Sequence, residues 1–187
     1  VPAGHNPAKG VDRFKEEGKE RFLTSDELGR LGAALRLATT DGVPWDETDG
    51  RPLSKHAPVD VSNRRIRMSP QTAGAIRLLI FTGARLREIL HLEWGQIDFG
   101  RTMLFLPDSK TGKKPILLGT PALAVLKDLE QLALAEARLA DPRASKPLST
   151  YVFPTADLSR PRHDLQRAWK LIQRAAELPG LRLHDLR

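Results

Sequence analysis

The stretch that decides the fold is Thr82-Gly83-Ala84-Arg85-Leu86-Arg87-Glu88-Ile89-Leu90. It follows residues 73–80, a run dense enough in apolar side chains to predict a helix buried on most sides. Gly83 predicts the end of that helix, because glycine commonly takes the left-handed conformation just past a helix C-terminus. A second helix is expected over residues 84–91, so that Arg85 stands at a helix start.

Upstream of this stretch, the sequence predicts one further helix and an irregular segment. Residues Thr24–Glu27 have the spacing of a capping box, and apolar residues then recur at helical spacing over residues 25–38. Residues 39–68 are rich in Asp-Gly and proline turn formers, and no period lasts for more than a few residues. Ser69-Pro70 then predicts a new helix start, because serine can cap a helix and proline suits its first position.

Downstream, the apolar pattern changes from helical to alternating. Residues 103–106 and 115–118 predict two strands, and the polar and glycine residues 108–114 between them predict a hairpin tip. A long helix is expected over residues 120–141 and an amphipathic helix over residues 161–177. This order of helices, a small antiparallel sheet and further helices predicts an α+β domain that is mainly helical.

The composition narrows the class of partner. The chain has 187 residues, of which 40% are hydrophobic, enough for one core and a small appendage. Its 30 Lys and Arg against 23 Asp and Glu give a net charge of +7, which favours a polyanionic partner. No apolar run approaches the roughly 20 residues of a membrane span, so nucleic acid is favoured over membrane. The absence of cysteine excludes a disulfide framework, a thiolate metal site and a cysteine nucleophile.

Two further motifs follow the Arg85 stretch along the chain. They are Ser109-Lys110-Thr111-Gly112-Lys113, at the expected hairpin tip, and Leu183-His184-Asp185-Leu186-Arg187. An arginine at a helix start, a hairpin lysine and a His-x-x-Arg in this order resemble the catalytic domain of tyrosine recombinases, the phage-type integrases. The resemblance covers roughly residues 6–187 apart from 39–68, and it implies an integrase-like domain with a small antiparallel hairpin.

The resemblance implies a site built around one DNA phosphate. Arg85 and Arg187 match the two family arginines, and a guanidinium suits this role because it is planar, permanently charged and able to bond two oxygens. Lys110 would donate a proton to the departing 5′-oxygen, and His184 would bond the phosphate or shuttle a proton. Glu88 matches a supporting acid that orients its neighbours. From the residues alone, a surface ion pair between Arg85 and Glu88 is the alternative.

Six further basic residues are candidates for contacts with the DNA backbone: Arg64, Arg65, Arg67, Arg87, Lys113 and Lys114. The first three end the irregular segment 39–68, and the two lysines follow the hairpin motif. A solvated charge cluster is the alternative interpretation of each group. The histidines outside the motif fall in no metal-ligand spacing, and neither a metal nor another cofactor is expected.

The family's nucleophile is a tyrosine well beyond the second arginine, and no residue of this chain matches it. Tyr151 is the sole tyrosine. It precedes the His-x-x-Arg motif in a short apolar run, Tyr151–Pro154, that predicts an extended piece and a core residue. The chain as given is therefore expected not to cut DNA, while its parent protein would be a DNA breaking and rejoining enzyme.

The resemblance also implies a domain organisation. Residues 1–22 are expected to be a linker from a missing N-terminal DNA-clamping domain, residues 23–187 part of the catalytic domain, and residues 39–68 a loop insertion. Double-stranded DNA is the expected partner, with a parent protein that is tetrameric on DNA and a fragment that is monomeric. The resemblance also implies a cytoplasmic, nucleoid-associated protein of bacterial or phage origin that is encoded by a mobile element.

The leading hypothesis is site-specific recombination or integration of DNA through a 3′-phosphotyrosine intermediate in the parent protein. A type IB topoisomerase shares this chemistry and is the second enzymatic alternative. A non-catalytic DNA-binding remnant or regulator, motivated by the missing tyrosine, is an alternative of a different class.

Overall fold

Helix α1 (Ser25–Thr39) begins where the capping box predicts it. The Thr24 side chain accepts a hydrogen bond from the Glu27 amide, and the Glu27 carboxylate accepts one from the Thr24 amide. Four residues of its apolar face are buried: Leu31, Ala34, Leu35 and Ala38. The computed structural model describes residues 21–45, 55–109 and 112–187, so the expected linker over residues 1–22 lies almost wholly outside the described residues.

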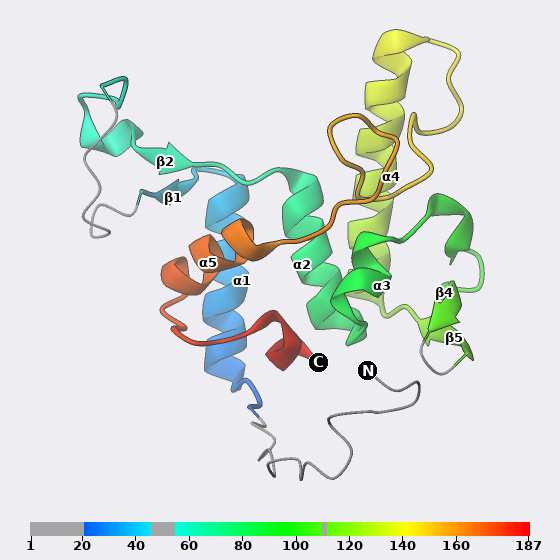
Figure 1. Ribbon diagram of the computed structural model, residues 1–187, viewed down its shortest axis with the longest axis horizontal. Coiled ribbons are helices and arrows are strands. Elements are labelled where there is room, and N and C mark those ends of the chain that lie inside the picture. The colour runs from blue at the N-terminus through cyan, green and yellow to red at the C-terminus, as the bar shows by residue number, and fades with distance from the viewer. Residues whose placement is uncertain (1–20, 46–54, 110–111) are drawn as a thin grey trace, which may run out of the picture.

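Helix α2 (Pro70–Thr82) is the central element of the fold, in contact with α1, α3 (Leu86–Leu90) and α4 (Thr120–Ala140) (Figure 1). Ser69 caps it, and seven of its thirteen residues are buried. Gly74 allows α4 to approach closely, because a Cβ at this position would lie 2.9 Å from Leu129 Cδ1. Gly83 ends the helix in the left-handed conformation, as the sequence predicts.

The hairpin expected after α3 is present. Strands β3 (Ile97–Asp98), β4 (Met103–Ser109) and β5 (Gly112–Leu117) form an antiparallel sheet in that order. Leu104 and Ile116 are paired and buried, whereas Phe105 beside them is exposed, so the alternation predicted from the sequence is confirmed.

The 39–68 segment has more local structure than its sequence predicts. Strands β1 (Val43–Pro44) and β2 (Arg65–Ile66) pair antiparallel, and a 3₁₀ turn, η1 (Val61–Asn63), precedes β2. These elements are held together by long-range backbone contacts that leave no local periodicity. The end of this segment is held to α1, because the Met68 amide donates to the Ala38 carbonyl at 2.8 Å.

Helix α5 (Gln166–Ala175) corrects a prediction, since it is shorter than the expected range 161–177. Pro161 forms an isolated bridge with Pro154, and the Arg162 amide donates to the Phe153 carbonyl at 2.8 Å. These tertiary contacts hold the first residues extended. Tyr151 likewise forms an isolated bridge, with Glu93, and belongs to no regular strand.

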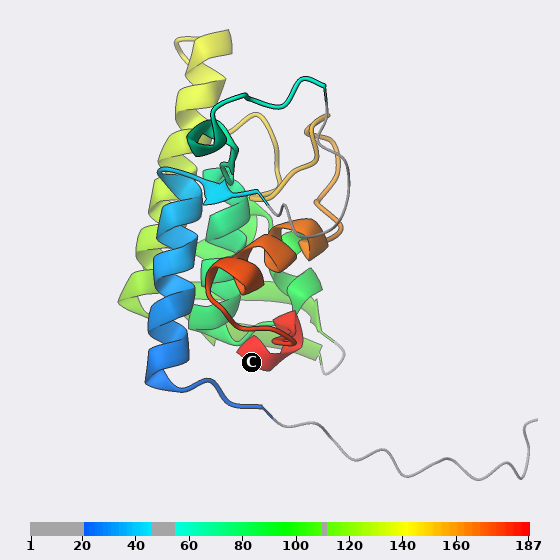
Figure 2. The ribbon, with the colours of Figure 1, turned by 90° about the vertical axis from the view of Figure 1, so that its left-hand side faces the viewer.

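The helices form layers. Helix α2 lies between α1 and α4 (Figure 1), and Figure 2 shows α5 and the C-terminal turn together beside α1. α5 contacts α1 and buries Leu165, Trp169 and Ile172 in the common core. The mainly helical α+β class with small antiparallel sheets is confirmed. None of the helices in the described residues is both long enough and apolar enough to span a bilayer.

Candidate functional site

The first arginine turn lies at the junction of α2 and α3. The Arg85 amide donates to Glu88 Oε2 at 2.7 Å, and Arg85 Nη1 donates to Glu88 Oε1 at 2.9 Å. The Glu88 side chain is 9% exposed and that of Arg85 is 35% exposed. Since arginine has five N–H donors, this bond orients the guanidinium and leaves others available for a ligand. The ion pair expected as the alternative exists, and it is compatible with the phosphate-binding interpretation.

The second turn, η3 (Leu183–Leu186), is built in the same way from different residues. The Arg182 amide donates to Asp185 Oδ2 at 2.7 Å, and Arg182 Nη2 donates to Asp185 Oδ1 at 2.7 Å. The Arg182 hydrogen bonds are the main cause of the lowered pKa of Asp185, whose side chain is 5% exposed. His184 and Arg187 are exposed on this turn at a spacing of three residues, which a 3₁₀ helix places on one face.

The turn η3 is anchored by α5. Trp169 Nε1 donates to the Leu181 carbonyl at 2.8 Å in a buried hydrogen bond, and Gln173 Nε2 donates to the same carbonyl. Leu178 and Leu181 are buried, which holds the connection between α5 and η3 in the core. The position of His184 and Arg187 therefore depends on α5.

The two turns meet at Gly83. A Cβ built on this glycine would lie 3.9 Å from Arg187 Cγ, which is ordinary van der Waals contact. Arg187, about 100 residues further along the chain, thus passes over the residue that ends α2, two positions before Arg85. The structure brings together the segments that carry Arg85, Glu88, His184 and Arg187.

The hairpin tip with its lysines, which is the third part of the motif, lies largely outside the described residues. Lys110 is outside the described residues, and no side chain between residues 107 and 114 is described, so this also applies to Lys113 and Lys114. The backbone of β4 and β5 forms the hairpin on which the three lysines were expected.

The remaining backbone candidates differ in their surroundings. Arg64 Nε donates to the Pro58 carbonyl at 2.9 Å, and Arg65 Nη1 donates to the Gly42 carbonyl at 3.0 Å, so both stabilise the segment 39–68. Arg67 and Arg87 are exposed. Of these four, Arg67 and Arg87 are the better placed for an external ligand.

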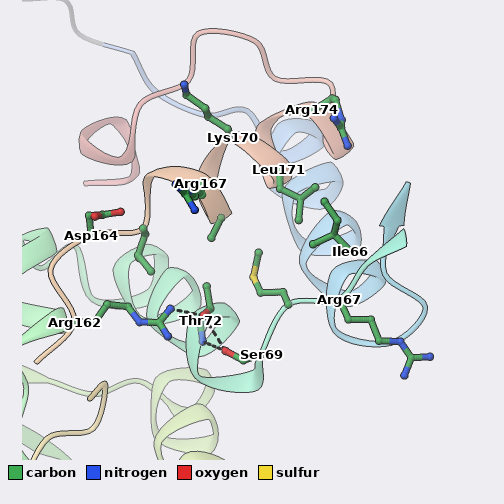
Figure 3. A pocket seen from close by; sticks show the side chains of 13 residues that line it. Ile66, Arg67, Ser69, Thr72, Arg162, Asp164, Arg167, Lys170, Leu171 and Arg174 are labelled. Atoms are coloured by element: carbon green, nitrogen blue, oxygen red, sulfur yellow. Dashed lines mark hydrogen bonds between the residues drawn. The ribbon is translucent and has the colours of Figure 1, made fainter. Parts of the chain in front are cut away.

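The structure also gathers basic residues that the sequence reasoning missed. A hollow of about 850 Å³ lies between α5, the start of α2 and residues 66–68 (Figure 3). We call it the basic hollow; its cationic lining residues are Arg67, Arg162, Arg167, Lys170 and Arg174. The last three recur on one face of α5. The spacing of three and four residues within the amphipathic segment is the signal that could have revealed them.

His91 lies near Arg87, which is in the first arginine turn, and near His163. Burial lowers the pKa of His91, and the nearby Arg87 and His163 lower it further by disfavouring a third positive charge. Arg87 follows Arg85 by two residues, and His163 follows Arg162 of the hollow. Arg87 and His163 therefore both lie near His91, although they are far apart in the sequence.

Two further predictions from the sequence concern Tyr151 and a metal site. Tyr151, expected to be a core residue, is half-buried and lines a small cavity beside Trp94 and Gln71. Within the described part of the chain, no group of three or more His, Asp or Glu side chains is arranged to hold a metal ion.

Comparisons with known proteins bear on the family and the fold of the chain. The sequence model of the phage integrase family matches residues 59–187, more than half of the chain. No individually curated protein matches the sequence.

Similar folds occur in solved structures of the XerA recombinase (TM-score 0.53, 15% identity, 92% of this chain and 49% of that chain) and of the XerH site-specific recombinase bound to its difH substrate (TM-score 0.53, 16% identity, 93% and 42%). The Tn1549 transposon integrase in complex with circular intermediate DNA is a third (TM-score 0.50, 12% identity, 98% and 54%). The chain thus spans about half the length of these proteins. The match of the family model over residues 59–187 shows that the chain belongs to the phage integrase family.

Proposed function

We propose that this chain is part of the catalytic domain of a tyrosine recombinase that cleaves and rejoins DNA at specific sites. The observation that supports the proposal is the proximity of Arg187 to Gly83, since a Cβ added to Gly83 would lie 3.9 Å from Arg187 Cγ and Arg85 follows Gly83 by two residues. The solved structures of XerH and the Tn1549 integrase are complexes with DNA, which supports double-stranded DNA as the partner.

In the proposed reaction, a tyrosine hydroxyl supplied by the parent protein from outside residues 1–187 attacks the phosphorus. A 3′-phosphotyrosyl bond forms and the bond from phosphorus to the 5′-oxygen breaks. Lys110 gives a proton to the departing 5′-oxygen, while His184 bonds the phosphate or accepts the tyrosine proton. The 5′-hydroxyl of a partner strand then attacks the phosphotyrosine, which releases the tyrosine and joins the strands.

The two arginines stabilise the negative charge that spreads over the non-bridging oxygens in the transition state. Preorganised donors of this kind are worth about 10²–10³ in rate each. Glu88 contributes by fixing one edge of the Arg85 guanidinium before the phosphate arrives, which reduces the reorganisation needed in the reaction.

The experiment is a strand-cleavage assay on the parent protein that contains this chain. We expect Arg85→Ala to slow formation of the covalent protein–DNA adduct about 100-fold or more, because one preorganised donor is lost. Arg36→Ala is the control, since it removes an exposed arginine of α1 that is not among the candidate DNA contacts. Unchanged adduct formation by Arg85→Ala would contradict the proposal.

The alternatives give different results in the same system. A type IB topoisomerase would relax supercoiled DNA without exchanging strands between paired sites, whereas a recombinase joins them. A non-catalytic DNA-binding protein would bind the duplex and form no adduct at all.

A further inference from the structure

We infer that Arg30 of α1 is a positioning residue for the proposed reaction. It holds the end of α5 against α1, and thereby fixes where the turn η3 presents His184 and Arg187. The inference rests on the proposed function, because it takes these two side chains as part of the phosphate site. Arg30 belongs to neither arginine turn, so it would act on the reaction only through the residues that it holds.

Arg30 makes three hydrogen bonds that bridge α1 and the end of α5. Its Nη1 donates to the Ala176 carbonyl at 2.8 Å and to the Glu177 carbonyl at 3.0 Å. Its Nε donates to Asp26 Oδ2 at 3.1 Å, one turn earlier on α1. Asp26 therefore orients the guanidinium, whose remaining donors join two segments that are 146 and 147 residues apart in the sequence.

The end of α5 has a conformation that benefits from such support. Glu177 has a φ of 55°, in the left-handed region, where glycine is the usual residue because a Cβ is strained. The Leu178 amide donates back to the Gln173 carbonyl at 2.9 Å, which closes the helix end. The Ala176 carbonyl has no amide partner within the helix, so the positively charged Arg30 is a favourable donor to it.

The same helix end leads directly into the second arginine turn. Leu178 and Leu181 are buried, and the Leu181 carbonyl accepts a hydrogen bond from Trp169 of α5. His184 follows Leu181 by only three residues. A shift of the end of α5 would therefore be transmitted to η3, because the short connection between them is packed into the core.

The start of α1 approaches η3 itself through a second arginine. Arg21 Nη2 donates to Glu27 Oε1 at 2.9 Å, and Glu27 also forms the capping box of α1. The pKa of Asp185 is lowered mainly by the Arg182 hydrogen bonds and, to a smaller extent, by the charge of Arg21. The first turns of α1 and the residues before it thus lie near both ends of the connection from α5 to η3.

Helix α1 is a common support of the two arginine turns. It contacts α2, which leads into the Arg85 turn, and α5, which leads into η3 (Figure 1). The start of α5 is held separately, since Arg162 Nη1 donates to Thr72 Oγ1 of α2 at 2.5 Å. Arg30 thus holds the end of α5 that continues to His184. A displacement of about 1 Å at a reacting group can cost about 100-fold in rate.

The test uses the parent protein that contains this chain, with the duplex that the unchanged parent cleaves. We expect Arg30→Ala to slow covalent adduct formation at saturating DNA by about 10- to 100-fold, because the phosphate-binding side chains of η3 are displaced. The DNA concentration that gives half the maximal rate should change by less than about twofold, since ground-state contacts are kept. Arg30→Lys keeps the charge and three N–H donors, and it should recover part of the rate.

Two controls separate positioning from charge and from stability. Arg36→Ala removes an exposed arginine from the last turn of the same helix and should change neither quantity. Gly32→Ala is combined with Arg30→Ala, because no atom lies within 4 Å of the added Cβ and alanine favours a helix more than glycine. We expect this pair to regain melting temperature but not rate. All rates are measured well below the melting temperature of every variant.

Hydrogen exchange in this chain reads the position of η3 without any reaction. We expect Arg30→Ala to speed the exchange of the backbone amides of residues 178–187, because the helix end that anchors them is released. Arg36→Ala should leave these amides unchanged. Equal exchange over residues 178–187 in the unchanged chain and in Arg30→Ala would overturn the inference.

The remaining outcomes separate this inference from the proposed function. A normal adduct rate for Arg30→Ala, together with a slow rate for Arg85→Ala, would overturn the inference and leave the recombinase proposal standing. Recovery of the rate on adding Gly32→Ala would mean that Arg30 acts through stability alone, which also overturns it. Equal losses in Arg30→Ala and Arg36→Ala would attribute the effect to charge, with the same consequence. No adduct from the unchanged parent would overturn both.

Discussion

The two arginine turns use one local device for different purposes. In each turn, a carboxylate three residues on accepts hydrogen bonds from the backbone amide and the guanidinium of the same arginine. In the first turn that arginine is the candidate phosphate ligand, Arg85. In the second it is Arg182, and the candidate ligand Arg187 lies at the far end of η3. The acid of such a turn therefore fixes the backbone and one arginine side chain in both cases. Only in the first turn is that arginine the candidate phosphate ligand.

The turns are also anchored differently. The first continues directly from α2 through Gly83, whose φ of 59° lies in the left-handed region. The second is separated from α5 and depends on the Leu181 carbonyl, which accepts from Trp169 and Gln173. The connection into the first turn is therefore set by backbone conformation at Gly83, and the connection into the second by side-chain hydrogen bonds to Leu181.

The largest expected effects come from removing the two acids. We expect Glu88→Ala and Asp185→Ala each to lower the free energy of unfolding by about 2 kcal/mol, because a helix-start hydrogen bond and a charged acceptor are lost. Urea denaturation of the two variants measures this. If Asp185→Ala left the stability unchanged, the second turn would not be held by its acid.

The second-largest effect on stability is expected for Gly83, which has the left-handed conformation. Gly83→Ala is expected to cost about 1–2 kcal/mol, because a Cβ is strained at this positive φ. Gly29→Ala in α1 is the control, since no atom lies within 4 Å of the added Cβ, and it should stabilise the protein by about 1 kcal/mol. Thermal unfolding compares the pair. Equal shifts in the same direction would contradict a conformational role for Gly83.

Two tryptophans test the anchoring of the second turn. Trp169→Phe removes the buried hydrogen bond to Leu181 and should cost about 1 kcal/mol beyond the loss of packing. Trp94→Phe removes an indole N–H that has no partner among the described residues, so no hydrogen-bond cost is expected. The difference between the two unfolding free energies isolates the hydrogen bond. No difference would mean that packing alone holds the turn.

The smallest expected effect is the pH dependence of Asp185. Its pKa is lowered in the folded protein by the Arg182 hydrogen bonds. The stabilisation is therefore fully present above the unfolded pKa of about 3.9 and is lost as the pH falls through the folded value. We expect the stability difference between the unchanged chain and Asp185→Asn to shrink between about pH 5 and pH 2. A constant difference in urea titrations over this range would show that the charge of Asp185 contributes nothing.

Much of the fold was predictable because its signals are local. The Thr24 capping box, the Ser69-Pro70 helix start, the Gly83 stop and the alternation in β4 each involve residues only a few positions apart. Hydrogen bonds of a cap and the period of a strand act over that range. The exceptions were the start of α5 and the strand pair of β1 and β2, whose residues are held by partners remote in the sequence.

The candidate site shows the same contrast between local signals and long-range contacts. The sequence by itself determined which residue types stand at each turn: Arg85 with Glu88, and His184 with Arg187 around Asp185. Only the tertiary structure decided that Arg187 lies against Gly83 and that Arg162 bonds Thr72, 90 residues earlier. Such contacts depend on how the helices pack around α2, which no short stretch of the chain encodes, because packing is set by the combined shape of many buried side chains.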